Sequence, residues 1–431
     1  MRVFYFCFMK SNREIIFDHY MQSRVVTTDT RQLMRGALFF ALKGQNFNGN
    51  DFQKEALDQG CSLVIVDEPK IVDPRIIVVG DVLEALQQLA LDYRDTWEFP
   101  VIALTGSNGK TTTKELMRDV LAKRYKVHAT RGNLNNHIGI PLTILSTPAD
   151  TEIAVIEMGA NHQREIASYC LYAKPTHGYI TNIGKAHLEG FGGQEGVKKG
   201  KKELYDYLHQ TQGCIFVNHE LPFMLEITTG MEVISFESMD KYEAKDLGSG
   251  MEIVIMEKGN PWRLQCHLAG LYNLFNVAVA WEIGRYFEVS EQDCCDAISA
   301  YIPENMRSQW KETQKNRLIL DAYNANPTSL ENAIVHLAKQ QGQDILAIVG
   351  EMREMGSESV AEHQHIVDVI LSQAVPAILV GKEFEFAKDR FTWFANVEAL
   401  CEHLQQVSLS GKLILIKGSR GIQLEKVLPY L

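Results

Sequence analysis

The sequence predicts an α/β protein with parallel sheets, organised as three domains. The chain has 431 residues, and a typical domain has about 150. Short apolar runs recur along it, and stretches with helical periodicity separate them. Strands that alternate with helices indicate parallel sheets built from βαβ crossovers. Polar or glycine residues follow almost every run, at the carboxyl edge where such sheets gather ligands, so we expect a site there.

The expected elements fall into three blocks, which we place at residues 1–98, 99–303 and 304–431. In the first block we expect strands at 37–42, 62–67 and 75–79, and helices at 51–59 and 83–94. In the second block we expect strands at 101–104, 153–156, 178–183 and 214–217, with a helix at 114–124. In the third block we expect strands at 318–320, 345–349, 377–380 and 413–416, and helices at 329–339, 360–371 and 397–406.

The composition is that of an ordinary globular chain, with 45% hydrophobic and 23% charged residues. The net charge of −11 argues against a nucleic-acid partner. The eight cysteines form no C-x-x-C pair, which favours free thiols in a reducing compartment. Residues 1–9 are apolar but too short to span a bilayer, and they lack a small-residue cleavage site. We therefore expect a cytoplasmic protein without a membrane span.

The strongest single motif is Gly106-x-x-Gly109-Lys110-Thr111, which follows an expected strand and precedes an expected helix. Glycines let the backbone N–H groups face a phosphate, and a helix N-terminus adds partial positive charge. Lys110 would neutralise phosphate charge, and the Thr111 hydroxyl would hold Mg²⁺. Two residues separate the glycines, where the common P-loop has four. The motif predicts a nucleotide phosphate site.

Three further features stay open on the residues alone. Glu157 ends an expected strand, where it suits Mg²⁺ or simply the surface. His187 is a lone histidine, and imidazole is not a typical Mg²⁺ ligand. The basic run 198–202 is a solvated helix face or a positive rim around a phosphate-rich site, and no interleaved aromatic residues favour nucleic acid.

The order of several stretches resembles that of the ATP-dependent Mur ligases, which add amino acids to the UDP-linked peptidoglycan precursor. The resemblance extends from about residue 27 to residue 420. The stretches that carry it are Thr28–Arg31, Gly36–Gly44, Thr105–Thr113, Gly132–Pro141, Glu157–His162, Asn182–Glu189, Asp321–Pro327 and Lys417–Gly421. The short glycine spacing of the phosphate loop is the family's own. The resemblance implies a small N-terminal α/β uridine-binding module, a central P-loop ATPase-type parallel sheet and a C-terminal Rossmann-like doubly wound domain.

The resemblance also implies an ATP site. Its residues are Thr105, Gly106, Ser107, Asn108, Gly109, Lys110, Thr111, Thr112, Asn273, Asn276, Arg307 and Asp321. In the family the two asparagines lie near the base, and the arginine and aspartate reach the phosphates and the ribose. Asn273 equally suits a helix N-terminus, where asparagine is an ordinary cap. Tyr272 stands where the family often has histidine.

The family's magnesium ligands match Thr111, Glu157, His187 and Lys201. The matching lysine is carbamylated in many Mur ligases, which converts an ammonium into an anionic oxygen ligand. Gly200 and Lys202 flank Lys201 where the family often has alanine and glycine. The resemblance therefore implies Mg²⁺ as a cofactor and a modified Lys201.

Substrate contacts are implied in all three blocks. Thr30 and Arg31 match positions near the uridine diphosphate, whereas Asn48 stands where relatives often carry aspartate. Asn135 and Asn136 belong to the central-domain stretch. Asn324 and Asn326 are candidates for selecting the incoming amine, although both also suit a turn before Pro327.

The resemblance is most specific to the members that join D-alanyl-D-alanine to UDP-N-acetylmuramoyl-tripeptide. It implies an ATP-driven amide ligase acting through an acyl phosphate, in cell-wall biogenesis and hence cell shape and division. The catalytic residues would be Lys110, His187, Lys201, Arg307 and Asp321. We expect a monomer whose third domain closes on the second, and the third residue of the tripeptide, diaminopimelate or lysine, stays open.

Three alternatives stay in view. A Mur ligase that adds the diamino acid typically carries Asp-Asn-Pro-Arg in the third block, where this chain has Asn324-Ala325-Asn326-Pro327. A folylpolyglutamate synthase would leave the N-terminal module unexplained. A non-catalytic nucleotide-binding regulator would need a damaged site, yet Lys110, Glu157, His187, Arg307 and Asp321 are all present.

Overall fold

The computed structural model describes residues 10–236, 238–340 and 342–431. The short apolar start at residues 1–9, with Cys7, lies outside the described residues. The chain divides into two compact units. Over the described residues, the first comprises residues 10–103, 126–159 and 165–177, and the second comprises residues 104–125, 160–164, 178–236, 238–340 and 342–431.

The first unit contains a four-stranded parallel sheet in the order β1-β2-β5-β6. Its strands are β1 (Val26–Thr27), β2 (Leu38–Phe40), β5 (Leu63–Val66) and β6 (Ile76–Val78), with a hairpin of β3 (Lys43–Gly44) and β4 (Phe47–Asn48). Its first helices are α1 (Asn12–Ser23), α2 (Gln53–Asp58) and α3 (Val82–Arg94). The apolar runs of β2 and β5 are wholly buried, as expected for strands covered on both faces. The strands expected at 37–42, 62–67 and 75–79 are confirmed.

Helix α3 attaches the N-terminal sheet to the rest of the first unit, which includes α5 (Gly139–Leu145) and α6 (Glu165–Ala173). The Tyr93 hydroxyl donates to the Thr147 carbonyl at 2.8 Å. The buried Arg94 guanidinium donates to the carbonyls of Ala173 and Lys174, at the C-terminal end of α6. A cation is favoured there because the carbonyl end of a helix carries partial negative charge.

The middle part of the chain forms a six-stranded sheet in the order β12-β11-β10-β7-β9-β8. Its strands are β7 (Val101–Thr105), β8 (Val127–Ala129), β9 (Ile153–Glu157), β10 (His177–Ile180), β11 (Cys214–Val217) and β12 (Ile234–Ser235). The helices between them are α4 (Lys110–Leu121), α7 (Leu188–Phe191), α8 (Gln194–Thr211) and α9 (Met224–Ile227). Helix α4 begins at Lys110, earlier than the expected residue 114. Three consecutive threonines weaken the helical pattern there, but the turn after Gly109 starts the helix.

An antiparallel sheet of β13 (Tyr242–Asp246), β14 (Met251–Glu257) and β15 (Asn260–Cys266) departs from the expectation of parallel sheets throughout. Burial alternates along β14, with Met251, Ile253 and Ile255 inside, which is the pattern of a half-exposed strand. The turn between β14 and β15 uses Lys258 and Gly259, both at positive φ, as tight hairpins require. Helices α10 (Leu274–Tyr286) and α11 (Glu291–Ala300) follow.

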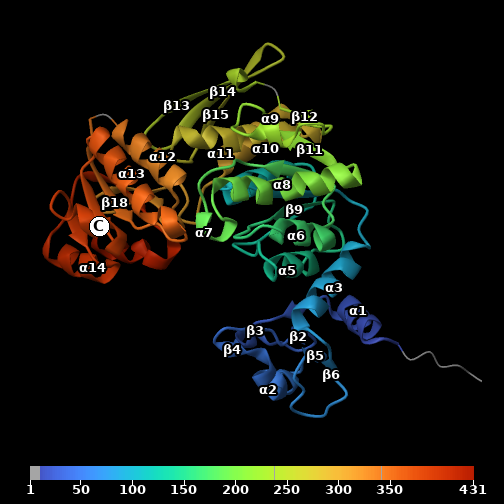
Figure 1. Ribbon diagram of the computed structural model, residues 1–431. Helices are drawn as coiled ribbons and strands as arrows, with labels where there is room; N and C mark the ends of the chain where they lie inside the picture. Colours follow the sequence, from blue (N-terminus) through green and yellow to red (C-terminus); the bar gives the residue numbers. More distant parts are fainter. Residues whose placement is uncertain (1–9, 237, 341) are drawn as a thin grey trace, which may run out of the picture. The chain divides into compact units, whose positions relative to one another are not determined.

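The C-terminal sheet has the order β16-β17-β21-β18-β19-β20, and only β16 runs antiparallel to its neighbour. Its strands are β16 (Gln309–Glu312), β17 (Arg317–Asp321), β18 (Asp344–Gly350), β19 (Ala377–Val380), β20 (Thr392–Phe394) and β21 (Lys412–Lys417), and its helices are α12 (Pro327–Ala338), α13 (Ser359–Ser372) and α14 (Val397–Gln406). Alternate strand residues face two cores: Ile319 packs with α12 and α13, and Leu318 packs with α14. The expected doubly wound domain is confirmed (orange and red in Figure 1).

Candidate active site

The phosphate loop between β7 and α4 depends on its two glycines. Gly106 has φ +143° and Gly109 has φ +78°, which L side chains rarely adopt. A Cβ atom on Gly106 would lie 2.0 Å from Thr181 Oγ1, and one on Gly109 would lie 2.5 Å from Asn276 Oδ1. Both positions therefore require glycine, on conformational and on steric grounds.

The segment after β10 holds the loop in shape. The Asn108 backbone N–H donates to Asn182 Oδ1 at 2.9 Å, and the Thr181 hydroxyl donates to the Asn108 carbonyl at 2.6 Å. The Ser107 hydroxyl donates to the Gly184 carbonyl at 3.0 Å and accepts from the Gly184 N–H at 2.9 Å. These bonds fix the curled backbone without using a ligand, so the loop is preorganised.

Lys110 is the first residue of α4, and its side chain folds back over the phosphate loop. Its ammonium donates to the Gly106 carbonyl at 2.7 Å and to the Ser107 carbonyl at 3.3 Å. Thr111 and Thr112, in the same first turn of α4, are buried, as is Thr105 at the end of β7. The expected phosphate-site residues therefore lie together at one helix N-terminus, where anions are favoured.

Asn273 and Asn276 connect this loop to the start of α10. Asn276 Oδ1 accepts from the Thr113 hydroxyl at 3.0 Å, and Asn276 Nδ2 donates to Asn273 Oδ1 at 2.7 Å. Asn273 Nδ2 donates to the Ala269 carbonyl at 2.7 Å. The Asn273 side chain makes no capping bond, so the alternative of an ordinary helix cap does not describe it.

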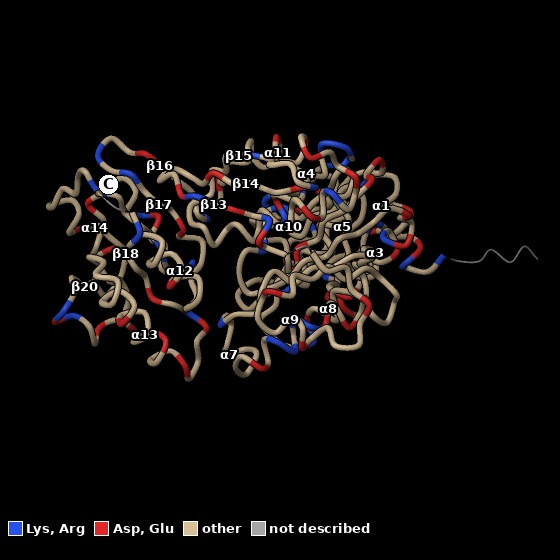
Figure 2. Tube along the Cα trace, turned by 90° about the horizontal axis from the view of Figure 1, so that it is seen from above, with Lys and Arg blue, Asp and Glu red and all other residues tan. Residues whose placement is uncertain are grey.

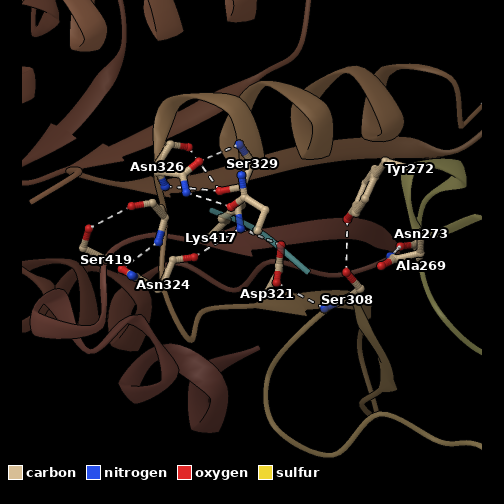
Figure 3. A network of polar contacts seen from close by, with 12 residues as sticks. Ala269, Tyr272, Asn273, Ser308, Asp321, Asn324, Asn326, Ser329, Lys417 and Ser419 are labelled. Atoms are coloured by element: carbon tan, nitrogen blue, oxygen red, sulfur yellow. Dashed lines mark hydrogen bonds and ion pairs between the residues drawn. The ribbon is translucent and has the colours of Figure 1, made fainter. Parts of the chain in front are cut away.

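The C-terminal sheet contributes a charged pair where β17 and β21 end, in which Lys417 is buried and Asp321 is partly buried. Asp321 and Lys417 are partners in the parallel register, and Lys417 Nζ lies 2.6 Å from Asp321 Oδ2 (Figure 3). Asp321 Oδ1 accepts from the Ser308 backbone N–H at 3.1 Å. The family resemblance implies a role for Asp321 and none for Lys417. The signal available was its position directly after the apolar run 413–416.

Arg307 lies in a turn next to this pair. Its neighbours Met306 and Ser308 both have positive φ, which is uncommon outside glycine. The guanidinium carbon lies 3.7 Å from the centroid of the Tyr323 ring, a cation–π contact. The Tyr323 N–H donates to the Met306 carbonyl at 3.2 Å. Tyr323 thus supports Arg307 through both its ring and its backbone, a contact that sequence reasoning missed.

Asn326 brings α12 to the phosphate loop. It caps α12, since its Oδ1 accepts from the Ser329 N–H at 3.0 Å, and its Nδ2 donates to Asn108 Oδ1 at 2.7 Å. Asn324 instead satisfies its own turn, because its Oδ1 accepts from the Ala325 N–H at 2.9 Å. The turn interpretation fits Asn324, whereas Asn326 serves both the helix and the loop.

His187 faces a carboxylate that sequence reasoning missed. Its Nδ1 contacts Glu354 Oε2, and both residues have positive φ. The hydrogen bond to His187 lowers the pKa of Glu354 from its ordinary value. Nearby, Lys185 forms an ion pair with the buried Glu362 of α13. No local pattern relates residues 187 and 354, so only the fold could find this pair.

Lys201 is buried in α8, at 1% exposure, and its ammonium lies 5.1 Å from the centroid of the Phe191 ring. A Cβ atom on Gly200 would lie 2.4 Å from that ring, which explains a glycine where relatives often have alanine. Elsewhere in the basic run, Lys198 pairs with Glu195 and Glu226, and Lys202 pairs with Asp206.

These pairs neutralise much of the basic run. Figure 2 shows acidic residues beside the basic ones around α8 and α9. A nucleic-acid surface requires an uncompensated positive patch. The run therefore does not form such a surface.

The remaining candidates lie in the first unit. Glu157 is buried at the end of β9, and its Oε1 accepts from Asn135 Nδ2 at 2.7 Å, so the structure brings these two together. Asn136 Oδ1 accepts from the Gly139 N–H at 2.8 Å at the start of α5.

The N-terminal candidates Thr30 and Arg31 lie in a short 3₁₀ helix, Thr30–Gln32. The exposed Arg31 guanidinium forms an ion pair with Asp29. Their side-chain hydrogen bond lowers the pKa of the Asp29 carboxyl to about 2. Asn48 Nδ2 donates to Glu68 Oε2 at 3.1 Å, and its Oδ1 accepts from the Asn50 N–H at 3.0 Å. Asn48, the last residue of β4, thus caps the 3₁₀ helix Gly49–Phe52 that follows it.

The donor chemistry fits magnesium bound with a nucleotide. Mg²⁺ at such sites takes one or two protein oxygens and completes its shell with phosphate oxygens and water. Among the described residues no group of three or more His, Cys, Asp or Glu side chains could hold a metal, but the Thr111 hydroxyl at the phosphate loop is an oxygen donor of the kind that Mg²⁺ prefers.

Over the described residues, no helix is long and apolar enough to cross a membrane.

Comparison with known proteins gives a consistent result along the chain. Family models match in order: the Mur ligase family catalytic domain at residues 23–94, the Mur ligase middle domain at 104–284 and the Mur ligase glutamate ligase domain at 306–420. The UDP-N-acetylmuramoyl-tripeptide–D-alanyl-D-alanine ligase of Bacillus subtilis (strain 168) is 33% identical over 422 residues, covering 94% of this chain and 92% of that protein. The chain belongs to the Mur ligase family.

Solved structures agree with this Mur ligase in fold. A crystal structure of MurF from Acinetobacter baumannii is 30% identical, with a TM-score of 0.85 over 94% of this chain and 92% of that chain. MurF from Thermotoga maritima in complex with ADP is 24% identical and shares the fold, with a TM-score of 0.84 over 98% of both chains. The three-domain architecture that the sequence predicts for this Mur ligase is confirmed.

Proposed function

We propose that this Mur ligase joins D-alanyl-D-alanine to UDP-N-acetylmuramoyl-tripeptide, with ATP as the energy source and Mg²⁺ as cofactor, in peptidoglycan precursor synthesis. The observation that carries the proposal is the match to the B. subtilis ligase of that name over 94% of the chain. The phosphate loop supports it, because its glycines, Lys110 and Thr111 are all in place at the N-terminus of α4.

The reaction forms an amide in two steps. The terminal carboxylate of the tripeptide attacks the γ-phosphorus of ATP, an O–P bond forms, and ADP leaves. The amine of D-alanyl-D-alanine then attacks the acyl carbon, the C–O bond breaks, inorganic phosphate leaves, and the amine loses a proton. The first step brings two anions together, so the site must supply positive charge where negative charge develops. Lys110 and Arg307 are the groups that we propose for this task.

The other residues receive roles by their position in the site. We propose that Thr105–Thr112 surround the phosphates, that Asn273 and Asn276 lie near the base, and that Asp321 binds the ribose. Bound magnesium would neutralise phosphate charge, and Thr111, Glu157, His187 and a carbamylated Lys201 would hold it. Water exclusion by closure of residues 304–431 over 99–303 would protect the acyl phosphate from hydrolysis.

The substrate contacts and the domain bounds 98/99 and 303/304 are part of the same proposal. Thr30 and Arg31 would bind the uridine diphosphate, and Asn135 and Asn136 would line the path of the peptide. Asn324 and Asn326 would contribute to D-alanyl-D-alanine selection. We propose that the protein acts in the cytoplasm, because ATP and the nucleotide-linked precursor are supplied in that compartment, and that it acts as a monomer.

One experiment separates this proposal from the alternatives. Phosphate release from ATP–Mg²⁺ is measured with tripeptide precursor and D-alanyl-D-alanine each present or omitted, and the product is weighed by mass spectrometry. We expect release only with both substrates, and a mass gain of one D-alanyl-D-alanine residue. Turnover with single amino acids instead would indicate a sister ligase, and ATP binding without any release would indicate a regulator. Precursors with diaminopimelate or lysine, tested in parallel, identify the preferred tripeptide.

A further inference from the structure

Lys417 is a buried lysine at the carboxyl end of β21. It is 2% exposed, and its ammonium contacts two acceptors, Asp321 Oδ2 at 2.6 Å and the Asn324 carbonyl at 3.2 Å. Figure 3 shows Lys417 between these two groups, which come from the end of β17 and from the turn before α12. One ammonium thus holds both the end of β17 and the turn that follows it, residues 321–324.

The first branch leads to Arg307. Asp321 uses its second oxygen to accept from the Ser308 backbone N–H at 3.1 Å. The Ser308 carbonyl accepts from the Ala269 N–H at 2.9 Å, and its hydroxyl contacts the Tyr272 hydroxyl at 3.2 Å (Figure 3). Ser308 directly follows Arg307 in a turn of unfavourable φ, so the carboxylate that Lys417 holds also fixes the turn that carries the arginine.

The second branch leads to the phosphate loop. Lys417 holds the Asn324 carbonyl, and the Ser419 hydroxyl donates to the Ala325 carbonyl at 3.4 Å. The next residue, Asn326, donates to Asn108 Oδ1 at 2.7 Å. The turn 324–326, which Lys417 and Ser419 hold by hydrogen bonds, is therefore the turn that contacts the phosphate loop.

A buried ion pair is weak evidence for stability, because desolvation of two charges offsets most of their attraction. An apolar side chain of similar length would fill the same space. What an apolar side chain cannot do is orient the Asp321 carboxylate and the Asn324 carbonyl together. The geometry therefore points to orientation, and not to stability, as the use of this lysine.

We infer that Lys417 is a positioning residue of the nucleotide site. It acts through Asp321 on Arg307 and the ribose contact, and through Asn324 on the turn that meets the phosphate loop. This inference rests on the proposed function, because it takes the nucleotide to be ATP bound at this edge.

The test compares Lys417→Met with Lys412→Met. Lys412 lies at the other end of the same strand and pairs with the exposed Asp344, so the chemical change is the same but the site differs. The readouts are the Kd of a fluorescent ATP analogue, the KM values for ATP and for the UDP-linked tripeptide, and thermal unfolding. We expect Lys417→Met to raise the Kd and the ATP KM about tenfold or more and to leave the KM for the UDP-linked tripeptide within twofold. Lys412→Met should match the wild type.

Two more variants keep the test decisive. Lys417→Arg retains a charged donor and should return the ATP Kd to within about threefold of the wild type. If Lys417→Met does not fold, Lys417→Gln takes its place, because the amide keeps a donor without the charge.

A folded variant with unchanged ATP affinity would overturn the inference, as would equal losses for both substrates. Failure of the wild type to ligate, with ATP binding retained, would instead refute the proposed function. The Kd comparison would still test Lys417 in that case.

Discussion

The phosphate loop and the C-terminal edge both lie where parallel strands end, yet they are built differently. The loop is shaped by glycines and by neutral hydrogen bonds from the neighbouring segment 181–184. The C-terminal edge is shaped by a part-buried ion pair between residues that are 96 positions apart. A rigid phosphate cradle thus depends on backbone geometry, whereas the turn that carries Arg307 depends on a charged support.

The largest effect is expected from the loop's own cation. Lys110→Met removes the charge that we place beside the developing phosphate charge, and kcat should fall about 10²–10³-fold, the usual cost of one such group. Lys123→Met, at an exposed position beyond the end of α4, is the control. Steady-state kinetics checks both. A kcat within threefold of the wild type would remove Lys110 from the catalytic step and leave the C-terminal edge as the main source of charge.

The loop's geometry is tested by Gly106→Ala. The added Cβ would meet Thr181 Oγ1 at a backbone conformation that alanine disfavours, so the free energy of unfolding should fall by about 2 kcal/mol or more. Gly80→Ala is the matched control, because nothing lies within 4 Å of its Cβ position. Denaturant unfolding measures both. Equal stabilities would mean that the loop tolerates side chains and is not held by glycine.

The link between the two regions is tested by Asn326→Ala. Loss of the cap should cost about 1 kcal/mol of unfolding free energy, and loss of the contact with Asn108 should also raise the ATP KM severalfold. Asn396→Ala removes an equivalent cap from α14 and provides the control. An ATP KM that is the same in both variants would show that the loop and the edge work independently.

The smallest effect is expected at an exposed ion pair. Lys198→Met removes the pairs with Glu195 and Glu226, and the unfolding free energy should change by less than about 1 kcal/mol with no change in ATP KM. A raised ATP KM at low salt would revive the interpretation of run 198–202 as a positive rim around the phosphates. Kinetics at two ionic strengths settles the point.

The sequence predicts whatever is local in this chain. The apolar runs predict the main strands of both parallel sheets around the site. The phosphate loop is predicted by Gly106, Gly109 and Lys110, because all three act within one turn. The antiparallel sheet was missed, although the alternation along β14 and the Lys258-Gly259 turn carried its signal.

The sequence could not predict contacts between residues that lie far apart along the chain. Nothing near Asp321 indicates Lys417, and nothing near His187 indicates Glu354. Arg307 was identified by family resemblance alone, and its support by Tyr323 follows from how the turn folds. Such contacts depend on which strands and loops become neighbours, which a single sequence does not specify.

Oxygen transfer from substrate to phosphate tests most directly whether the ligation passes through an acyl phosphate. Both oxygens of the terminal carboxylate of the tripeptide precursor are labelled with ¹⁸O, and the phosphate released with ATP and D-alanyl-D-alanine is analysed by mass spectrometry. Ligation through an acyl phosphate predicts one ¹⁸O atom in each phosphate released, because the bridging oxygen leaves with the phosphorus. Amide product accompanied by unlabelled phosphate would contradict a reaction through an acyl phosphate, since the carboxylate would then not have attacked the γ-phosphate.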